Sequence, residues 1–371
     1  MARRPSSRAR IAQWPLLAGV VAVVWFLGSI AVETSSRRHG ALGFGFLADP
    51  TNFEIPFRLI SWEVGDTYAR ALLVCVLNTL LAAAMSIVVA TLLGLVVGIM
   101  RLSANWLVRN IALGFIELVR NTPQLVQIIF WYVAVLQTLP GPRQSIALPG
   151  GALLNVRGLY LPSFVANDLA VTFWPLAFVL LLAIPFVWFL PWRGFRVGTR
   201  SLLLLPLASL PFVAGIDHAE LPALRGFNIV GGVQVVPELV ALCMGLSIYA
   251  AAFIAEIVRA AILSVHNGQR EAALSLGLRP RQVLSKIILP QALRVMVPPL
   301  TSQYLNIIKS SSLGAAVAYP ELYEIFAGTA MMQSNREIES IALLMGVFLS
   351  INLIVSALMN WYNRRVALVV R

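Results

Sequence analysis

Five charged residues stand inside otherwise apolar stretches of this 371-residue chain. Glu117 and Arg120 are three residues apart, as are Glu256 and Arg259, and Lys309 stands alone. A charge at the centre of a membrane span costs about 2.5–3.5 kcal/mol on insertion scales, so such a group should be paired or face water. Residues three apart share a helix face, so each acid and base could form a local ion pair. Alternatively, two helices that each carry both signs could form a cavity for a small zwitterion.

Two further features lie close to these charges. Thr122-Pro123 interrupts the ladder of backbone donors near Arg120, because proline has no N–H. The freed backbone groups could face a ligand or water, or the bend could be an ordinary packed kink. Three serines, 310–312, follow Lys309, and their hydroxyls could satisfy carbonyls at a helix irregularity or line a polar path. The simpler alternative for Lys309 is a side chain that extends from a helix end to the interface.

The composition that surrounds these residues is that of a membrane protein. Hydrophobic residues make up 59% of the chain and charged residues 12%, whereas an ordinary soluble domain is about a quarter charged. A mean hydropathy of +0.82 excludes a soluble globular class. Low charge density, two cysteines and the absence of a glycine period exclude disordered, disulfide-rich and collagen-like classes. The net charge of +12 does not indicate a nucleic-acid-binding protein, because the Lys and Arg residues are spread between the apolar stretches.

Eight apolar stretches are long enough, or nearly so, to cross a bilayer, which takes about 20 helical residues. They are Trp14–Val32, Ala71–Met100, Ile111–Leu139, Val171–Trp192, Ser201–Ile216, Glu238–Leu263, Pro299–Ala318 and Ser340–Trp361. The second is long enough to tilt or project from the bilayer, and the fifth, with two prolines, could be re-entrant. The first could be a cleaved secretory signal, but its apolar part is long for one, so we expect a retained helix.

The distribution of cations sets the expected orientation. With the N-terminus inside, the cytoplasmic segments hold about twice as many Lys and Arg residues as the outer ones, which predicts that both termini are cytoplasmic. Glu271 is the only acidic residue in any inner loop of that arrangement. The pattern therefore predicts an all-α polytopic membrane protein that is embedded in a lipid bilayer.

The longest inner loop, residues 264–298, has the pattern of a docking element. From Glu271 it reads EAALSLGLRPRQVLSKIILP. Helix formers begin a first helix at Glu271, Gly277 ends it, Pro280 opens a second helix and Pro290 stops it. A partly apolar face recurs at helical spacing: Ala273, Leu276, Val283, Leu284, Ile287 and Ile288. Such an elbow suits a groove in another protein, or could lie on lipid headgroups.

This string resembles the EAA loop of ABC-importer permeases, with all fixed positions at the family spacing. These positions are Glu271, Ala272, Ala273, Gly277, Ile287, Leu289 and Pro290. ELVRNTPQL at 117–125, YAAAFIAEIVRAAILSV at 249–265 and IKSSSL at 308–313 resemble permeases of polar-amino-acid importers, the histidine/glutamine group. The enlarged plan of the chain resembles the longer permease subunits of general L-amino-acid importers.

The resemblance implies a type I ABC-importer transmembrane fold with about eight transmembrane helices. Residues 68–139 and 238–371 would form its core, 1–67 an extra helix with an outer loop, and 140–237 an insertion with two further spans. Its first part, 140–169, is rich in Pro and Gly, which suggests turns and short strands.

The same resemblance implies a subunit of the cell inner membrane that forms half of a translocation pathway. Its expected partners are a cytoplasmic ABC ATPase dimer, a second permease, which the likeness to the longer general-type subunits suggests is a paralogue, and a periplasmic amino-acid-binding protein. ATP and Mg would be bound by the ATPase, so we expect no cofactor on this chain and no enzymatic activity of its own.

Two sets of residues have expected roles. The elbow motif is implied to couple the permease to the ATPase. For the substrate, we hypothesise that Arg120 and Glu256 contact the passing amino acid, with Arg259, Gln124 and Asn306 in support. Thr122, Pro123 and Lys309 are expected to have structural or gating roles.

Other chemistry is weakly supported by the sequence. Neither Lys286 nor Lys309 follows a glycine, so a P-loop is not expected. Asp217, His218 and Glu220 could bind a metal, but three ligands in four loop residues favour a solvated turn. An ion-gradient-driven amino-acid transporter is the main alternative function. A membrane-embedded enzyme or assembly factor is a second, but no nucleophile–base pattern supports it.

Overall fold

The computed structural model describes residues 43–166 and 216–366, together with single positions between residues 15 and 33. The expected spans Val171–Trp192 and nearly all of Ser201–Ile216 lie outside the described residues. The chain divides into two compact units, of which the first comprises Met1–Ile129 with Ala241–Arg371 and the second Phe130–Val240. These boundaries differ by three to ten residues from the expected limits of the insertion.

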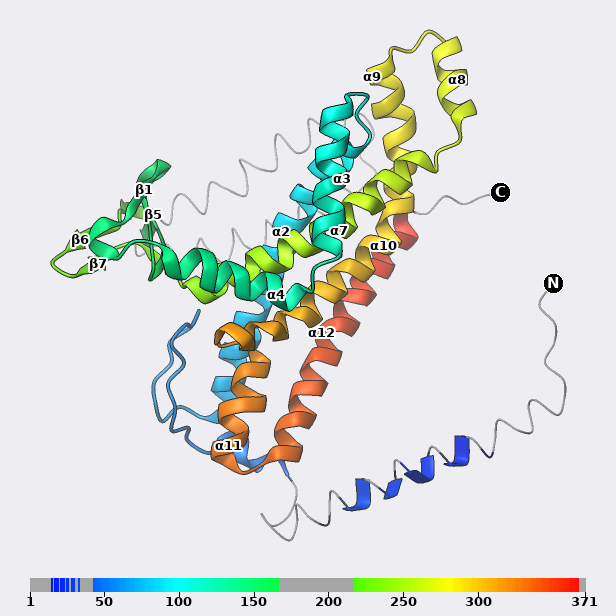
Figure 1. The fold of residues 1–371 in the computed structure, drawn as a ribbon. Helices are drawn as coiled ribbons and strands as arrows, with labels where there is room; N and C mark the ends of the chain where they lie inside the picture. Colours follow the sequence, from blue (N-terminus) through cyan, green and yellow to red (C-terminus); the bar gives the residue numbers. More distant parts are fainter. Residues whose placement is uncertain are drawn as a thin grey trace. The chain divides into compact units, whose positions relative to one another are not determined.

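Long apolar helices dominate the first unit (Figure 1). Within the part of the chain that the structure describes, four helical stretches are long and apolar enough to cross a membrane: Tyr68–Arg101, Pro237–Leu263, Pro280–Val317 and Glu337–Trp361. The helices are α2 (Tyr68–Arg101), α3 (Trp106–Arg120), α4 (Gln124–Ile129), α7 (Pro237–Leu263), α8 (Asn267–Ser275), α9 (Pro280–Val283), α10 (Leu289–Ser310), α11 (Ala330–Ser334) and α12 (Glu337–Val366). Shorter 3-10 turns lie at η1 (Phe44–Ala48) and η7 (Ser311–Val317), and π-helical turns at η6 (Leu284–Ile288) and η8 (Glu324–Thr329).

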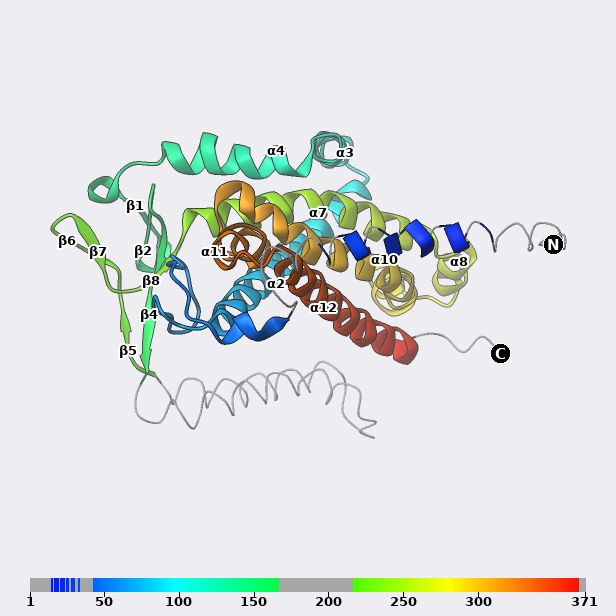
Figure 2. The same ribbon diagram turned by 90° about the horizontal axis from the view of Figure 1, so that it is seen from below.

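The expected single span Ile111–Leu139 is wrong. The chain leaves α3 after Arg120, re-enters a helix at Gln124, and α4 runs crosswise to α3 (Figures 1 and 2). Beyond α4 the helix continues only as the π-helical turn η2 (Phe130–Val135) and the 3-10 turn η3 (Leu136–Thr138) of the second unit. Proline at position 123 explains the break, since it cannot donate to the carbonyl of Val119.

Small residues let α2 and α7 approach closely. A Cβ atom added at Gly94 would lie 2.6 Å from the side chain of Ile254, and one at Gly98 would lie 2.8 Å from the carbonyl oxygen of Ala255. The two glycines are four residues apart and therefore face the same side of α2, a spacing that is common where membrane helices pack. A hydrogen bond of 3.0 Å between the hydroxyls of Thr91 and Tyr304 joins α2 to α10.

A buried polar network fixes the chain reversal that follows η7. The side-chain amide of Asn78 donates to the carbonyls of Phe57 and Pro320, at 2.9 and 2.8 Å. The Tyr319 hydroxyl donates to the Asn78 carbonyl, and Thr79 Oγ1 accepts from the N–H of Leu322. These bonds tie residues 319–322 to α2, so the reversal has a defined position in the first unit.

The buried Glu321 belongs to the same reversal. Its carboxylate oxygens accept from the backbone N–H groups of Tyr323 and Glu324, both at 2.8 Å. These are donors that have no intrahelical partner at the start of η8, so the carboxylate acts as a cap.

The described residues of the second unit form eight short strands, within 140–169 as expected and also beyond that range (Figure 2). They are β1 (Ile146–Leu148), β2 (Ala152–Asn155), β3 (Gly158–Leu161), β4 (Ser163–Ala166), β5 (Ile216–Glu220), β6 (Ala223–Arg225), β7 (Asn228–Val230) and β8 (Val233–Val235), with 3-10 turns η4 (Pro142–Gln144) and η5 (Pro149–Gly151). All pairings are antiparallel, in the order β1-β2-β3-β8 and in the pairs β4-β5 and β6-β7. The register of β1 with β2 aligns Ile146 with Leu154.

Candidate functional site

The elbow begins with a helix that starts earlier than expected. The α8 helix begins at Asn267, not at Glu271, because His266 precedes it as an N-cap. The Nδ1 atom of His266 accepts from the N–H of Gly268 at 3.1 Å and so satisfies a donor that has no intrahelical partner. Glu271 therefore lies in the second turn of α8 and is exposed.

Gly277 ends α8, as expected from the sequence. Its φ of +77° lies in the left-handed region that favours glycine. The N–H of Gly277 donates to the carbonyl of Leu274 at 2.9 Å, and the N–H of Leu278 donates to the carbonyl of Ala273 at 3.2 Å. This pair of bonds is a Schellman motif, which closes the last turn of the helix. The spacing between Ala273 and Gly277 therefore has a local structural reason.

The second arm of the elbow begins at Pro280 and does not stop at Pro290. The side chain of Gln282 accepts from the Arg279 N–H at 2.9 Å and caps α9. From α9 the helix passes through η6 into α10, with Pro290 in the first turn of α10. The expectation that Pro290 ends the helix is wrong, because the wider π-helical turn just before it accommodates a residue that cannot donate.

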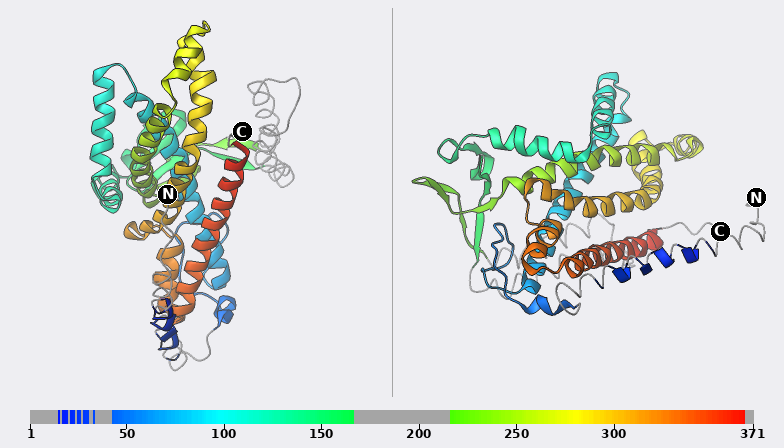
Figure 3. Two further views of the ribbon diagram at one scale, coloured as in Figure 1. Left: turned by 90° about the vertical axis from the view of Figure 1, so that its right-hand side faces the viewer. Right: turned by 60° about the horizontal axis from the view of Figure 1, so that its bottom comes forward.

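The elbow has an inner and an outer side. Ala273 and Val283 are buried, whereas Leu276 keeps 82% of its surface exposed. On the inner side, residues of α8, α9 and η6 line an apolar cavity of about 740 Å³ together with Ile99 and Leu263 at the ends of α2 and α7. The elbow projects past those helix ends (Figure 3). Its outer side is therefore available for another protein.

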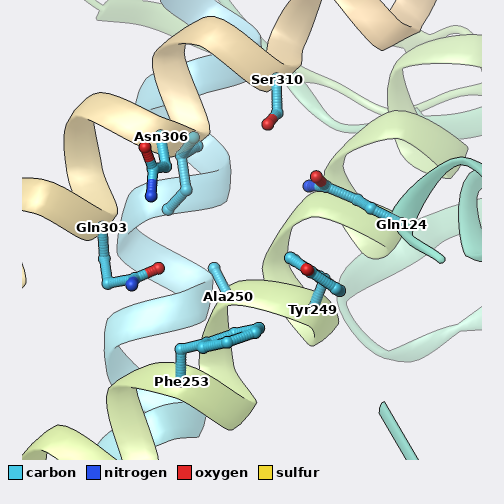
Figure 4. A pocket seen from close by; sticks show the side chains of 8 residues that line it. Gln124, Tyr249, Ala250, Phe253, Gln303, Asn306 and Ser310 are labelled. Atoms are coloured by element: carbon cyan, nitrogen blue, oxygen red, sulfur yellow. The ribbon is translucent and has the colours of Figure 1, made fainter. Parts of the chain in front are cut away.

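A second cavity lies among α4, α7 and α10, and all of its lining residues belong to the first unit. It has a volume of about 130 Å³, or about 400 Å³ with its open mouth, and is lined by Gln124, Tyr249, Ala250, Phe253, Gln303, Asn306, Ile307 and Ser310. Figure 4 shows the side chains of α10 and those of α7 on facing sides, with Gln124 pointing in between them. The volume of about 130 Å³ is below the range of about 300–1,000 Å³ that is typical of drug-sized ligands, and the amides and hydroxyls can both donate and accept hydrogen bonds.

The break between α3 and α4 places Gln124 at this cavity. Gln127, which is buried, donates from Nε2 to the carbonyl of Val119 at 3.0 Å and to that of Thr122 at 3.2 Å. The Val119 carbonyl is the one that residue 123 would bond in a continuous α-helix, so Gln127 replaces the N–H that Pro123 lacks. The Thr122 hydroxyl donates to the Leu118 carbonyl at 2.8 Å. Side chains thus satisfy the carbonyls of Leu118, Val119 and Thr122 at the bend.

Close packing holds α4 against α7. A Cβ atom at Gly245 would lie 2.4 Å from Cγ1 of Ile128 and 3.0 Å from its Cα atom. Only a residue without a side chain fits this contact. Gly245 therefore brings the start of α4, with Gln124, into the neighbourhood of Tyr249.

The charged residues that the sequence singles out flank the cavity and do not line it. Glu256 pairs with Arg259, since its Oε2 atom lies 2.9 Å from both Nε and Nη2. The local ion pair that the spacing allowed is therefore present. Arg120 places its guanidinium carbon 5.0 Å from the centre of the Phe253 ring, a cation–π contact.

At Lys309 the helix changes its geometry, as the serines suggest. The α-helical bonding of α10 ends at Ser310 and continues as the 3-10 turn η7. The hydroxyl of Ser311 donates to the carbonyl of Ile308 at 2.7 Å, and that of Ser312 to the carbonyl of Lys309 at 2.8 Å. Two of the serines thus satisfy backbone carbonyls, while Ser310 lines the cavity.

Gln124 and Asn306 are the two expected substrate residues that the structure brings to one cavity. The sequence interpretation missed Tyr249, Phe253 and Gln303, because it started from formal charges and took only two neutral side chains, Gln124 and Asn306, as supports. A usable signal was present, since Tyr249 and Phe253 are four residues apart, and Gln303, Asn306 and Ser310 follow a helical spacing. Among the described residues, no group of three or more His, Cys, Asp or Glu could hold a metal. Of the three residues considered for a metal in the sequence, His218 contacts the carboxylate of Asp217, with 2.9 Å between Nδ1 and Oδ2.

Comparison with known proteins agrees with this architecture. Residues 90–368 match the family described as binding-protein-dependent transport system inner membrane component. The protein YhdX of Escherichia coli (strain K12) is 45% identical, over 99% of this chain and 96% of its own. The general L-amino acid transport system permease protein AapQ of Rhizobium johnstonii is 41% identical, over 95% of this chain and 90% of its own.

A solved structure supports the fold. The crystal structure of an amino acid ABC transporter with histidines covers 80% of this chain and 95% of its own, with a TM-score of 0.51 and 19% identity. This likeness concerns the arrangement of helices, which is that of a type I ABC-importer permease. The extent of the family match and the near full-length relatives lead to one conclusion: the chain belongs to the multi-pass membrane permeases of binding-protein-dependent ABC transport systems, whose ATPase is a separate subunit.

Proposed function

We propose that this permease forms half of the pathway of an ATP-driven importer of L-amino acids in the cell inner membrane. The name of AapQ and that of a third relative support this substrate class. That relative is the glutamate/glutamine/aspartate/asparagine transport system permease protein BztB of Rhodobacter capsulatus, 36% identical over 95% of this chain. A second permease, a paralogue of this chain, completes the pathway. A periplasmic binding protein delivers the amino acid, and ATP and Mg bind to the ATPase.

The observation that carries the coupling part of the proposal is the elbow. Its α8 arm ends in a Schellman turn at Gly277, its inner side packs through Ala273 and Val283, and its outer side exposes Glu271 and Leu276. A protruding helix of this kind fits a groove in the ATPase and transmits the closure of the ATPase dimer to α7 and α10, which flank it. Ile287 and Leu289 are half-buried and connect the elbow to α10.

The cavity among α4, α7 and α10 is the proposed contact point for the amino acid. Gln124 and Asn306, with the neighbouring Gln303 and the hydroxyls of Tyr249 and Ser310, can bind the carboxylate and the ammonium group by hydrogen bonds. The pair Glu256–Arg259 and Arg120 set the electrostatic surroundings of the site. Outward and inward openings alternate around it during transport.

The test is ATP hydrolysis by the chain in lipid with its ATPase, second permease and binding protein, with and without L-amino acids. We expect stimulation by amino acids, and we expect Glu271→Lys to reduce co-purification of the ATPase. Glu63→Lys is the matched control, since Glu63 is an exposed acid outside the elbow and should leave the ATPase bound. Failure of the wild-type chain to retain any ATPase, with uptake that an uncoupler stops while ATP stays high, would establish an ion-gradient mechanism instead.

A further inference from the structure

The lining of the cavity carries no formal charge. Gln124, Gln303 and Asn306 contribute amides, Tyr249 and Ser310 contribute hydroxyls, and the remaining lining side chains are apolar. Amides and hydroxyls can satisfy both an ammonium group and a carboxylate. None of them supplies the negative charge that would compensate a cationic ligand side chain in a partly desolvated site.

The acid that follows the lining residues along α7 is already paired. Glu256 lies one turn along α7 from Phe253, and its Oε2 atom accepts from both Nε and Nη2 of Arg259 at 2.9 Å. Glu117, on α3, is exposed and has a long contact of 3.4 Å with the side-chain amide of Asn121. Neither carboxylate lines the cavity.

Two positive side chains adjoin the lining directly. Arg120 lies over the ring of Phe253, a lining residue, and no acid within the described ranges forms an ion pair with Arg120. Lys309, which is exposed, directly precedes the lining residue Ser310. Glu256 and Arg259 cancel each other, and the exposed Glu117 contacts Asn121, which is not a lining residue. The charges that directly adjoin the lining are therefore those of Arg120 and Lys309, and they leave a positive field at the cavity.

This positive field has a consequence for specificity that rests on the assignment of the cavity to the substrate. We propose that the permease itself selects by charge, and admits L-amino acids with neutral or anionic side chains in preference to those with cationic side chains. A zwitterion has no net charge and meets no net repulsion, and an anionic side chain is attracted by Arg120. A lysine or arginine ligand brings an extra positive charge for which the site has no counter-ion.

The test must separate the permease from the binding protein, which also selects substrates. The complex of both permeases with the ATPase is placed in lipid nanodiscs without the binding protein, and binding of L-glutamine, L-glutamate and L-arginine is titrated by calorimetry. We expect L-arginine to bind at least about tenfold more weakly than L-glutamine, the size of effect that one uncompensated charge gives in a partly solvated site.

Three substitutions sharpen this test. Ser310→Asp places an acid in the lining and should strengthen binding of L-arginine by about tenfold while weakening that of L-glutamate. Ser310→Asn introduces a side chain of the same shape as Asp but without charge, so L-arginine should remain the weakest of the three ligands. Ser312→Asp adds the same charge two residues away, at a serine that does not line the cavity, and should change the order little.

The outcomes are distinguishable. L-Arginine that binds the wild-type complex as tightly as L-glutamine overturns the charge selection and leaves the proposed function intact. If no amino acid binds while ATP hydrolysis remains coupled, the cavity is not the substrate site. Should Ser310→Asp not fold, the order of affinities for L-glutamine, L-glutamate and L-arginine in the wild-type complex still tests the proposal. Gln124→Glu then places the acid in the lining instead.

Discussion

The elbow and the cavity are built in different ways. Every hydrogen bond that shapes the elbow joins residues close in sequence, from the His266 cap to the Gly277 turn and the Gln282 cap. The cavity instead requires three helices, and it depends on contacts such as Gly245 with Ile128, more than a hundred residues apart. Damage to the elbow should therefore be local and leave the cavity intact, whereas a packing error beside the cavity should spread to the whole core.

The largest effect is expected from Gly245→Val, which disrupts the helix packing beside the cavity. The new side chain would overlap Ile128 and push α4 away from α7. We expect a loss of about 2–3 kcal/mol of stability, the upper part of the range for overpacking, together with loss of amino-acid binding. Thermal unfolding of the complex and calorimetric titration measure the two effects.

Gly114→Val is the control for that variant. Gly114 lies in α3 with nothing within 4 Å of an added Cβ atom, so the substitution should be nearly neutral. Equal unfolding temperatures for Gly245→Val and the wild-type complex would show that the α4–α7 contact does not hold the core.

A somewhat smaller effect is expected from Gln127→Leu. The change removes the donor that serves the carbonyls of Val119 and Thr122. The Val119 carbonyl keeps a long bond of 3.4 Å from the N–H of Thr122, whereas the half-buried Thr122 carbonyl is left as an acceptor without its side-chain donor. Such a group costs about 1–3 kcal/mol, so unfolding should begin at a lower temperature and Gln124 should lose its position. Gln291→Leu is the matched control, because Gln291 donates a single bond, to Ile287 within its own helical stretch, and is only half-buried. An unchanged affinity for L-glutamine in Gln127→Leu would contradict a positioning role.

On the elbow side, Gly277→Val tests the local turn. The position has open space around it, so the cost comes only from the backbone, whose φ of +77° a β-branched residue disfavours by about 1–2 kcal/mol. We expect weaker co-purification of the ATPase and unchanged amino-acid binding in the cavity. Gly277→Asn should recover much of the coupling, since Asn tolerates the left-handed region. Loss of binding in the cavity would show that the two regions are not independent.

The smallest effect on stability is expected from Leu276→Ala. Its side chain is 82% exposed, so truncation should change the unfolding free energy by less than about 0.5 kcal/mol. If the outer side of α8 docks into the ATPase, the affinity for the ATPase should nevertheless fall about fivefold, or about 1 kcal/mol. Sedimentation or surface binding of purified ATPase measures this, and an unchanged affinity would place the docking surface elsewhere on the elbow.

The sequence predicted features that depend on short-range contacts, such as the elbow, better than features that depend on helix packing, such as the cavity. The apolar stretches of α2, α7 and α12, the turn at Gly277 and the second helix from Pro280 were all predicted from residue types within a few positions. Pro290 was misjudged, because a proline ends a helix only when the turn before it is α-helical, and here that turn is π-helical. The break after Arg120 was expected as a bend, but its crosswise α4 was not.

By itself, the sequence determined the membrane class, the helical core and the elbow, because hydropathy, helix propensity and turn chemistry act over short stretches. Only the tertiary structure decided what surrounds the cavity. Which groups face one another there depends on helix packing through Gly94, Gly98 and Gly245, and on the pairing of Glu256 with Arg259. Neutral amides and hydroxyls become a site when three helices bring them together; their helical spacing indicates a shared helix face, but only the packing decides that these faces enclose a cavity.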